Sequence, residues 1–139
     1  MKKTIFFIGL VIATHASFAQ RKTTTSGIIS FDATTSLNEL PKADNKTVIA
    51  SVDTKKGTVA FEAIIKNFTF SNPKMQEHFN GATWMDSEKF PTSTFKGNIT
   101  NLSVVNFLKD GTYTANIEGT LTIHGETKKI KTTAADRKS

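Results

Sequence analysis

Few residues of this chain have the type and spacing that catalysis requires. Enzymes use a nucleophile beside a base, paired carboxylates or a cluster of metal ligands, and this sequence contains no cysteine and only three histidines. His15 belongs to a leader-like segment, and neither His78 nor His124 has a second histidine at a metal-ligand spacing such as H-x-x-x-H. The sequence therefore predicts a protein that is not an enzyme and that holds no metal and no cofactor.

The strongest chemical alternative is the adjacent pair Glu77 and His78. Such a pair could orient a polar head group or serve as a base in an enzyme or stress-response factor, although it is more often surface structure. Asp86 and Glu88 are two residues apart, and Lys89 beside them is expected to balance their charge rather than complete an acid–base pair. A role for Glu77 and His78 is therefore kept as the alternative.

Alternating apolar and polar residues indicate that most of the chain forms β-strands. The clearest strand covers residues 112–123, where one face is apolar or small and the other is polar without interruption. Further strands are predicted over residues 27–32, 47–53, 58–66, 92–100 and 127–133. Neither the spacing of parallel β-α-β units nor an internal repeat is present. We therefore expect an all-β, antiparallel fold of six or seven strands, built as a sandwich or a barrel.

Polar, glycine and proline clusters mark the connections between these strands. Residues 33–46 are predicted to form a long loop, and residues 132–139 a loose tail because apolar alternation stops there. Lys55-Lys56-Gly57 and Asp110-Gly111 indicate hairpins, and the segment His124-Gly125-Glu126 indicates a turn. Gly97 and Gly119 fall on apolar strand faces, where a missing side chain either lets the sheet bend or leaves room inside.

One stretch after Phe70 interrupts the strands. Asn72-Pro73 is typical of a helix start, and Asn80-Gly81 of a helix stop, because glycine readily adopts a positive φ. We therefore expect a short helix near residues 73–79 that caps the strands. Five apolar side chains are expected to form a plug there: Met75, Phe79, Trp84, Met85 and Phe90.

Residues 1–19 have the features of a secretory signal peptide. Lys2 and Lys3 form a basic start, residues 5–13 are mostly apolar, and Ala19 is a small residue at the expected cleavage position. The apolar run is shorter than the ~20 residues that a membrane span needs. We expect cleavage after Ala19, export to the periplasm or out of the cell, and one domain over residues 20–139 without a stable membrane span.

The charge pattern does not favour nucleic-acid binding. The formal net charge is +6, part of it comes from the predicted signal peptide, and the remaining lysines and arginines are scattered apart from a cluster near the end of the chain. A nucleic-acid interface would show a basic face with interleaved aromatic residues. Solvated strand faces explain the same residues more simply, so no nucleic-acid partner is expected.

Three segments together resemble one family. MQEHF (residues 75–79), MDSEKFPTSTFKG (85–97) and GTYTANIEGTLTIHGETKKI (111–130) are similar to the YceI-like family in its form with a signal peptide. The resemblance extends from about Gly27 to about Thr133. It implies a lipocalin-like antiparallel barrel whose apolar interior binds an isoprenoid or similar amphiphilic lipid.

The resemblance and the strand pattern together suggest which residues would surround such a lipid. Seven are expected on the wall of an apolar tube: Phe61, Ile65, Phe95, Ile99, Tyr113, Ile117 and Leu121. Phe79 and Trp84 are expected to close one end. Burial of a hydrocarbon chain releases about 0.8 kcal/mol per CH₂ group. The alternative that these residues simply fill a dry core stays open at this point.

The chain departs from the family in one respect. YceI-like chains usually continue well beyond the segment Thr127-Lys128, whereas this sequence reaches AADRKS shortly afterwards. The comparison suggests that at least one closing strand is missing and that the barrel is incompletely closed. Three outcomes follow as expectations: a truncated domain without ligand, a domain completed by a partner or by a homodimer, or an unstable one.

Overall fold

The computed structural model describes residues 21–37 and 41–138. The predicted signal peptide, residues 1–19, lies outside them. Seven strands form one antiparallel sheet in the order β1-β2-β3-β5-β6-β7, with β4 paired to β2. The strands are β1 (Arg21–Asp32), β2 (Lys42–Asp53), β3 (Thr58–Ile64), β4 (Thr69–Phe70), β5 (Thr92–Ile99), β6 (Gly111–Ile123) and β7 (Glu126–Lys138). The prediction of an all-β, antiparallel fold is therefore confirmed.

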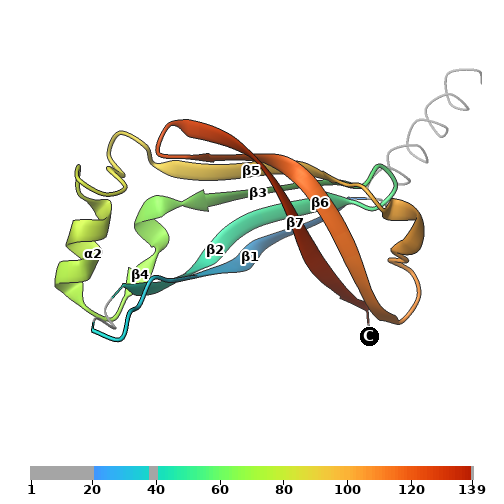
Figure 1. The fold of residues 1–139 in the computed structure, drawn as a ribbon, viewed down its shortest axis with the longest axis horizontal. Coiled ribbons are helices and arrows are strands. Elements are labelled where there is room, and N and C mark those ends of the chain that lie inside the picture. Colours follow the sequence, from blue (N-terminus) through green and yellow to red (C-terminus); the bar gives the residue numbers. More distant parts are fainter. Residues whose placement is uncertain (1–20, 38–40, 139) are drawn as a thin grey trace, which may run out of the picture.

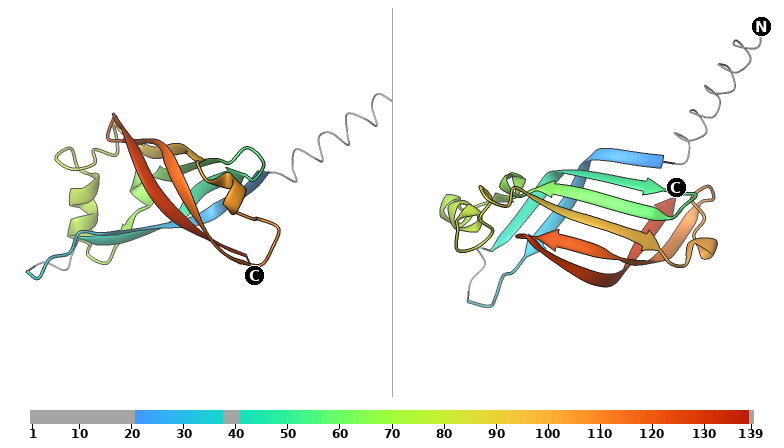
Figure 2. Two further views of the ribbon diagram at one scale, coloured as in Figure 1. Left: turned by 45° about the vertical axis from the view of Figure 1, so that its right-hand side comes forward. Right: turned by 90° about the horizontal axis from the view of Figure 1, so that it is seen from above.

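The sheet is curled but not closed. In Figure 1 the β6–β7 hairpin crosses obliquely in front of the long strands β1, β2 and β3. The view from above in Figure 2 shows that the strands follow one another around an open trough. Among the described residues, β1 pairs only with β2, and β7 pairs only with β6. The expected barrel is thus incompletely closed, with two free strand edges.

The helix α2 (Pro73–Asn80) stands at one end of the trough, beside β4 (Figure 1). Its start follows the sequence prediction, because the Asn72 side chain accepts hydrogen bonds from the amides of Lys74 and Met75 and Pro73 occupies the first turn. Its end differs in detail from the prediction. Gly81 has an extended φ of −73°, so the helix stops there without the left-handed conformation.

Two predicted connections prove to be strands. Residues 33–46 were expected to form a loop, but β2 already begins at Lys42, where Ala43 and Asn45 turn inward and are buried. Asn45 is a satisfied polar residue, because its amide donates to the Ile64 carbonyl at 2.9 Å and its oxygen accepts from Thr47. The expected loose tail, residues 132–139, is also wrong: β7 continues to Lys138 in unbroken register with β6. Backbone hydrogen bonds hold this part of β7, and they need no apolar side chains.

The predicted hairpins have mixed outcomes. Asp110-Gly111 does not form a tight hairpin, because residues 100–110, with a 3-10 turn η2 (Leu102–Val104), separate β5 from β6. The turn after β6 is confirmed and contains only two residues, His124 and Gly125, with φ values of 54° and 74°. Two consecutive positive φ angles are typical of the type I′ turn, whose twist matches that of the flanking strands.

The apolar inner face is packed at both ends of the trough. At the α2 end, Phe79 lies among buried residues of β2, β4 and the 3-10 turn η1 (Ile65–Asn67). At the opposite end, Ile99, Val105 and Ala115 are buried under η2. The sheet therefore has two separate core clusters, and its middle part connects them.

Two turn carboxylates accept hydrogen bonds that favour their charged form. Backbone N–H groups of Lys56 and Lys55 donate to Asp53 at 2.9 and 3.0 Å, and these bonds lower the pKa of Asp53. The hydroxyl of Thr34 donates to Asp32 at 2.6 Å and lowers its pKa in the same way. Both groups therefore stabilise the fold while they are ionised.

We expect acid to weaken the fold through these turns. A carboxylate with a lowered folded-state pKa contributes stability that is present above its unfolded pKa and is lost as pH falls through the folded value. Thermal melting followed by circular dichroism should show a constant Tm near neutral pH and a fall below about pH 4. The variant Asp53→Asn should show a shallower fall over that window. An unchanged pH profile in the variant would contradict the role of the Asp53 turn.

Candidate functional site

The middle of the inner face contains a pair of stacked aromatic rings. The sheet register places Phe61 of β3 opposite Phe95 of β5, and Phe95 opposite Leu121 of β6. The rings of Phe61 and Phe95 lie 5.0 Å apart with an interplanar angle of 18°, a separation typical of stacked rings. Phe95 is buried, whereas Phe61 and Leu121 are only partly buried. These three residues form an apolar surface that remains accessible from the trough.

Two glycines make room for one of these rings. A Cβ atom on Gly97 would lie 2.8 Å from the Phe95 ring, and one on Gly119 would lie 2.7 Å from it. Gly97 and Gly119 are also direct neighbours across β5 and β6. The sequence left open whether these glycines bend the sheet or leave an empty cavity. In the structure the space above both glycines holds the Phe95 ring.

A hollow of about 350 Å³ lies beside Phe61 and is bordered almost entirely by apolar atoms. This volume is at the lower end of the range for small-molecule pockets, roughly 300–1,000 Å³. The register places the following lining residues on the inner face: Lys22, Thr24, Ala50, Val52, Val59 and Phe61. Lys22 is the cationic member of this set. The hollow is open towards the free edge of β1, so a ligand could enter it from the side.

The structure distributes the predicted ligand-binding residues over three places. Phe61, Phe95 and Leu121 lie together in the middle of the trough. Ile65 and Phe79 are in the core cluster at the α2 end, whereas Ile99, Tyr113 and Ile117 belong to the cluster at the other end. Ile65, Phe79 and Ile99 are buried by protein atoms. The predicted tube wall is thus continuous along the trough, but its two ends are filled.

The predicted plug at the α2 end forms with one exception. The ring of Phe79 contacts Trp84 at 5.2 Å and Phe70 at 4.9 Å, and Met75 and Met85 pack against the same cluster. Trp84 retains 36% of its exposure and therefore lies at the rim of the plug. Phe90 is not in the plug: its ring lies 4.5 Å from that of His124, at the β6–β7 turn.

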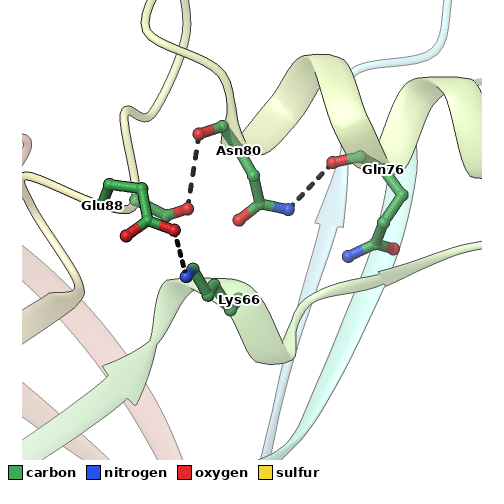
Figure 3. A network of polar contacts seen from close by, with 5 residues as sticks. Lys66, Gln76, Asn80 and Glu88 are labelled. Atoms are coloured by element: carbon green, nitrogen blue, oxygen red, sulfur yellow. Dashed lines mark hydrogen bonds and ion pairs between the residues drawn. The ribbon is translucent and has the colours of Figure 1, made fainter.

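A network of polar contacts ties the plug to the sheet (Figure 3). The Gln76 side chain donates to the Phe68 carbonyl at 2.6 Å and accepts from the Phe70 amide at 2.8 Å. Asn80 donates to the Gln76 carbonyl at 2.8 Å, and the ion pair between Lys66 and Glu88 joins the sheet side to the segment after α2 (Figure 3). These contacts fix the end of the trough rather than offer a reactive group.

The remaining candidates for chemistry lie apart from the trough. Glu77 and His78 are both exposed on α2. His124 is exposed in the β6–β7 turn, where its ring packs on Phe90. Within residues 21–37 and 41–138, no group of three or more metal-ligating side chains is close enough to hold an ion. None of the helices in this part of the chain has the length and apolar character of a membrane span.

Sequence reasoning missed part of the accessible inner surface. Val52, Val59 and Lys22 border the hollow, yet none of them was predicted as a ligand contact. The alternation along β2 and β3 did indicate that the two valines face inward, so this signal was available. Lys22 could not be assigned in the same way, because its strand begins before the apolar alternation starts.

An antiparallel sheet that curls around an apolar face, with a short helix across one end, defines an open member of the lipocalin-like class of folds. A family comparison gives the more specific assignment. The chain belongs to the YceI-like family, because the model of the YceI-like domain matches residues 11–138. No curated protein sequence matches the chain.

Solved structures agree with this fold. A polyisoprenoid binding domain from Saccharophagus degradans, implicated in plant cell wall breakdown, aligns with a TM-score of 0.63 and 11% identity over 84% of this chain. BcnA from Burkholderia cenocepacia aligns with a TM-score of 0.54 and 19% identity over 83% of this chain. The aligned part spans 66% of the first structure and 67% of the second. At these identities the likeness concerns the fold.

Proposed function

We propose that this protein binds the hydrocarbon chain of an isoprenoid-like or similar amphiphilic lipid along the middle of its trough. The observation that carries the proposal is the accessible apolar surface of Phe61, Phe95 and Leu121 beside the hollow of about 350 Å³. Each CH₂ group moved from water to such a surface contributes about 0.8 kcal/mol. The related domain from Saccharophagus degradans is described as polyisoprenoid binding, which supports the same class of ligand here.

The filled ends of the trough limit how such a lipid would lie. The core clusters around Phe79 and around Ile99 occupy the two ends, so the chain of the lipid would cross the middle and leave by the open side. Lys22 borders the hollow at that side and would face the polar head group. Binding in this position needs no catalytic residue, so we propose a binding protein rather than an enzyme.

The proposal includes export of the protein. Residues 1–19 have the basic start, the apolar run and the small residues at the cleavage position that signal peptides share. We expect the exported form, periplasmic or secreted, to begin at Gln20. Mass spectrometry of the protein recovered outside the cytoplasm tests this expectation, and an intact Met1 on that protein would contradict it.

Replacing Phe61 by glutamate should reduce lipid binding at least tenfold, equivalent to about 1.4 kcal/mol. The substitution removes one ring of the stacked pair and places a charge at the surface that the hydrocarbon chain would cover. Binding is measured by fluorescence of an apolar naphthylamine dye and by its displacement with farnesol.

The matched control for this experiment is Ile64→Glu, on the same strand. The Ile64 side chain is 41% exposed and lies on the outer face, so the added charge stays in water. We expect the control to bind the dye as the unmodified protein does. Equal binding by the Phe61→Glu variant, with an unchanged fold by circular dichroism, would overturn the proposed position of the lipid.

A further inference from the structure

The free edge of β7 is long, regular and open. All 13 residues of β7 pair with β6 without a register shift, and residues 131–135 are exposed. The other free edge, on β1, is irregular, because its pairing with β2 shifts register between Thr24 and Gly27 and again between Gly27 and Ile29. Irregularities of this kind discourage pairing with a further strand. The β7 edge is therefore the one suited to accept another strand.

The turn between β6 and β7 determines which residues present their backbone groups at this edge. In a two-residue hairpin, the residues that flank the turn, here Ile123 and Glu126, form a hydrogen-bonded pair. Hydrogen-bonded and non-hydrogen-bonded pairs then alternate along the ladder. The even-numbered residues of β7 thus bond to β6, and the odd-numbered residues direct N–H and C=O groups outward. A strand added at the edge must pair with the odd-numbered residues.

The sequence of β7 is complementary to itself in one such register. If two antiparallel copies of β7 meet on a two-fold axis at Thr132, the odd-numbered residues pair with one another, as the backbone requires. Residues of opposite charge then lie opposite each other at both ends: Glu126 opposite Lys138, and Lys128 opposite Asp136. Ile130 lies opposite Ala134. Cross-strand pairs of opposite charge and apolar pairs each contribute roughly 0.2–1 kcal/mol.

The neighbouring registers that satisfy the backbone all bring like charges together. An axis at Lys131 places that residue opposite its own copy, and an axis at Ile130 places Lys129 opposite Lys131. An axis at Thr133 places Lys129 opposite Arg137, and an axis at Ala134 places Lys131 opposite Arg137. Like charges directly opposite each other are destabilising. Charge therefore selects the axis at Thr132.

We propose that two copies of this protein associate through their β7 strands, with a two-fold axis at Thr132. The interface is isologous, as in most homodimers, and adds roughly twelve backbone hydrogen bonds between the copies. The inner faces of both troughs lie on the same side of the joined sheet. The occupant of the β7 edge is thus a second copy of this chain.

A single cysteine tests this register, because the natural sequence contains none. At a non-hydrogen-bonded position on the axis, the Cα atoms of residue 132 in the two copies are separated by about 4.5 Å, which permits a disulfide. Mild oxidation of the full-chain variant Thr132→Cys should therefore produce a covalent dimer within minutes, seen by non-reducing electrophoresis. The control is Ile130→Cys, whose copies would be about 13 Å apart, too far for a disulfide. Equal cross-linking of the two variants, or none in either, would overturn the proposal.

A charge exchange provides an independent test of the same pairing. Lys128→Asp places a negative residue opposite Asp136, twice in each dimer, and should weaken association severalfold in analytical ultracentrifugation. The double variant Lys128→Asp with Asp136→Lys restores opposite charges and should recover the affinity of the unmodified protein. Failure of this recovery, with the fold intact by circular dichroism, would contradict the axis at Thr132. A sedimentation coefficient of a monomer for all three proteins would contradict the dimer itself.

Discussion

Replacing Phe79 by alanine should destabilise the protein by about 3–5 kcal/mol. The side chain is 4% exposed, and its ring contacts the rings of Phe31, Phe68, Phe70 and Trp84 at centroid distances between 4.9 and 6.1 Å. Removing it leaves a cavity that α2 cannot collapse to fill, because Gln76 and Asn80 hold the helix in place. The expected loss is a large fraction of the 5–15 kcal/mol that stabilises a typical domain.

Urea unfolding measures this effect, with circular dichroism for the sheet and fluorescence of Trp84, the only tryptophan, for the plug. The midpoint should fall with little change in slope. The control Ile28→Ala removes a β1 side chain that is 63% exposed, and we expect a change within about 0.5 kcal/mol. A midpoint for the Phe79→Ala variant equal to that of the control would show that the plug is not a packed core.

Replacing Gly119 by alanine should cost about 3 kcal/mol, near the upper end of the range for overpacking. The added Cβ atom would lie 2.4 Å from the Lys96 carbonyl oxygen and 2.7 Å from the Gly97 Cα atom. Both contacts are with backbone, so they can be relieved only if β5 and β6 move apart. The same movement displaces the Phe95 ring, and we therefore expect weaker binding of the apolar dye as well.

Two further variants show whether this explanation is correct. Gly81→Ala adds a Cβ atom that lies 3.3 Å from the nearest non-neighbouring atom, the His78 carbonyl oxygen, and should cost less than about 1 kcal/mol. Phe95→Ala combined with Gly119→Ala should not restore stability, because the closest contact of the new methyl group is with Lys96. Full stability of Gly119→Ala alone would mean that β5 and β6 are not held as closely as the structure shows.

The local patterns of the sequence predicted much of this fold. Strict alternation over residues 112–123 identified β6, and Asn72-Pro73 identified the start of α2, because both signals depend only on neighbouring residues. The motifs around Phe90 and Gly119 identified the YceI-like family. The same patterns also indicated which residues face inward, including Phe61, Phe95 and Leu121, because side chains alternate between the two faces of a strand.

The tertiary structure decided how these inward residues are used. Alternation assigns a residue to a face, but it does not say which strand lies beside it or which ring fills a given space. Only the register between β5 and β6 shows that Gly97 and Gly119 accommodate the Phe95 ring, and only the packing shows that Phe79 and Ile99 lie in separate clusters. The full length of β7 was hidden for a related reason: its last residues are held by backbone pairing with β6, and the apolar pattern of a sequence does not record backbone hydrogen bonds.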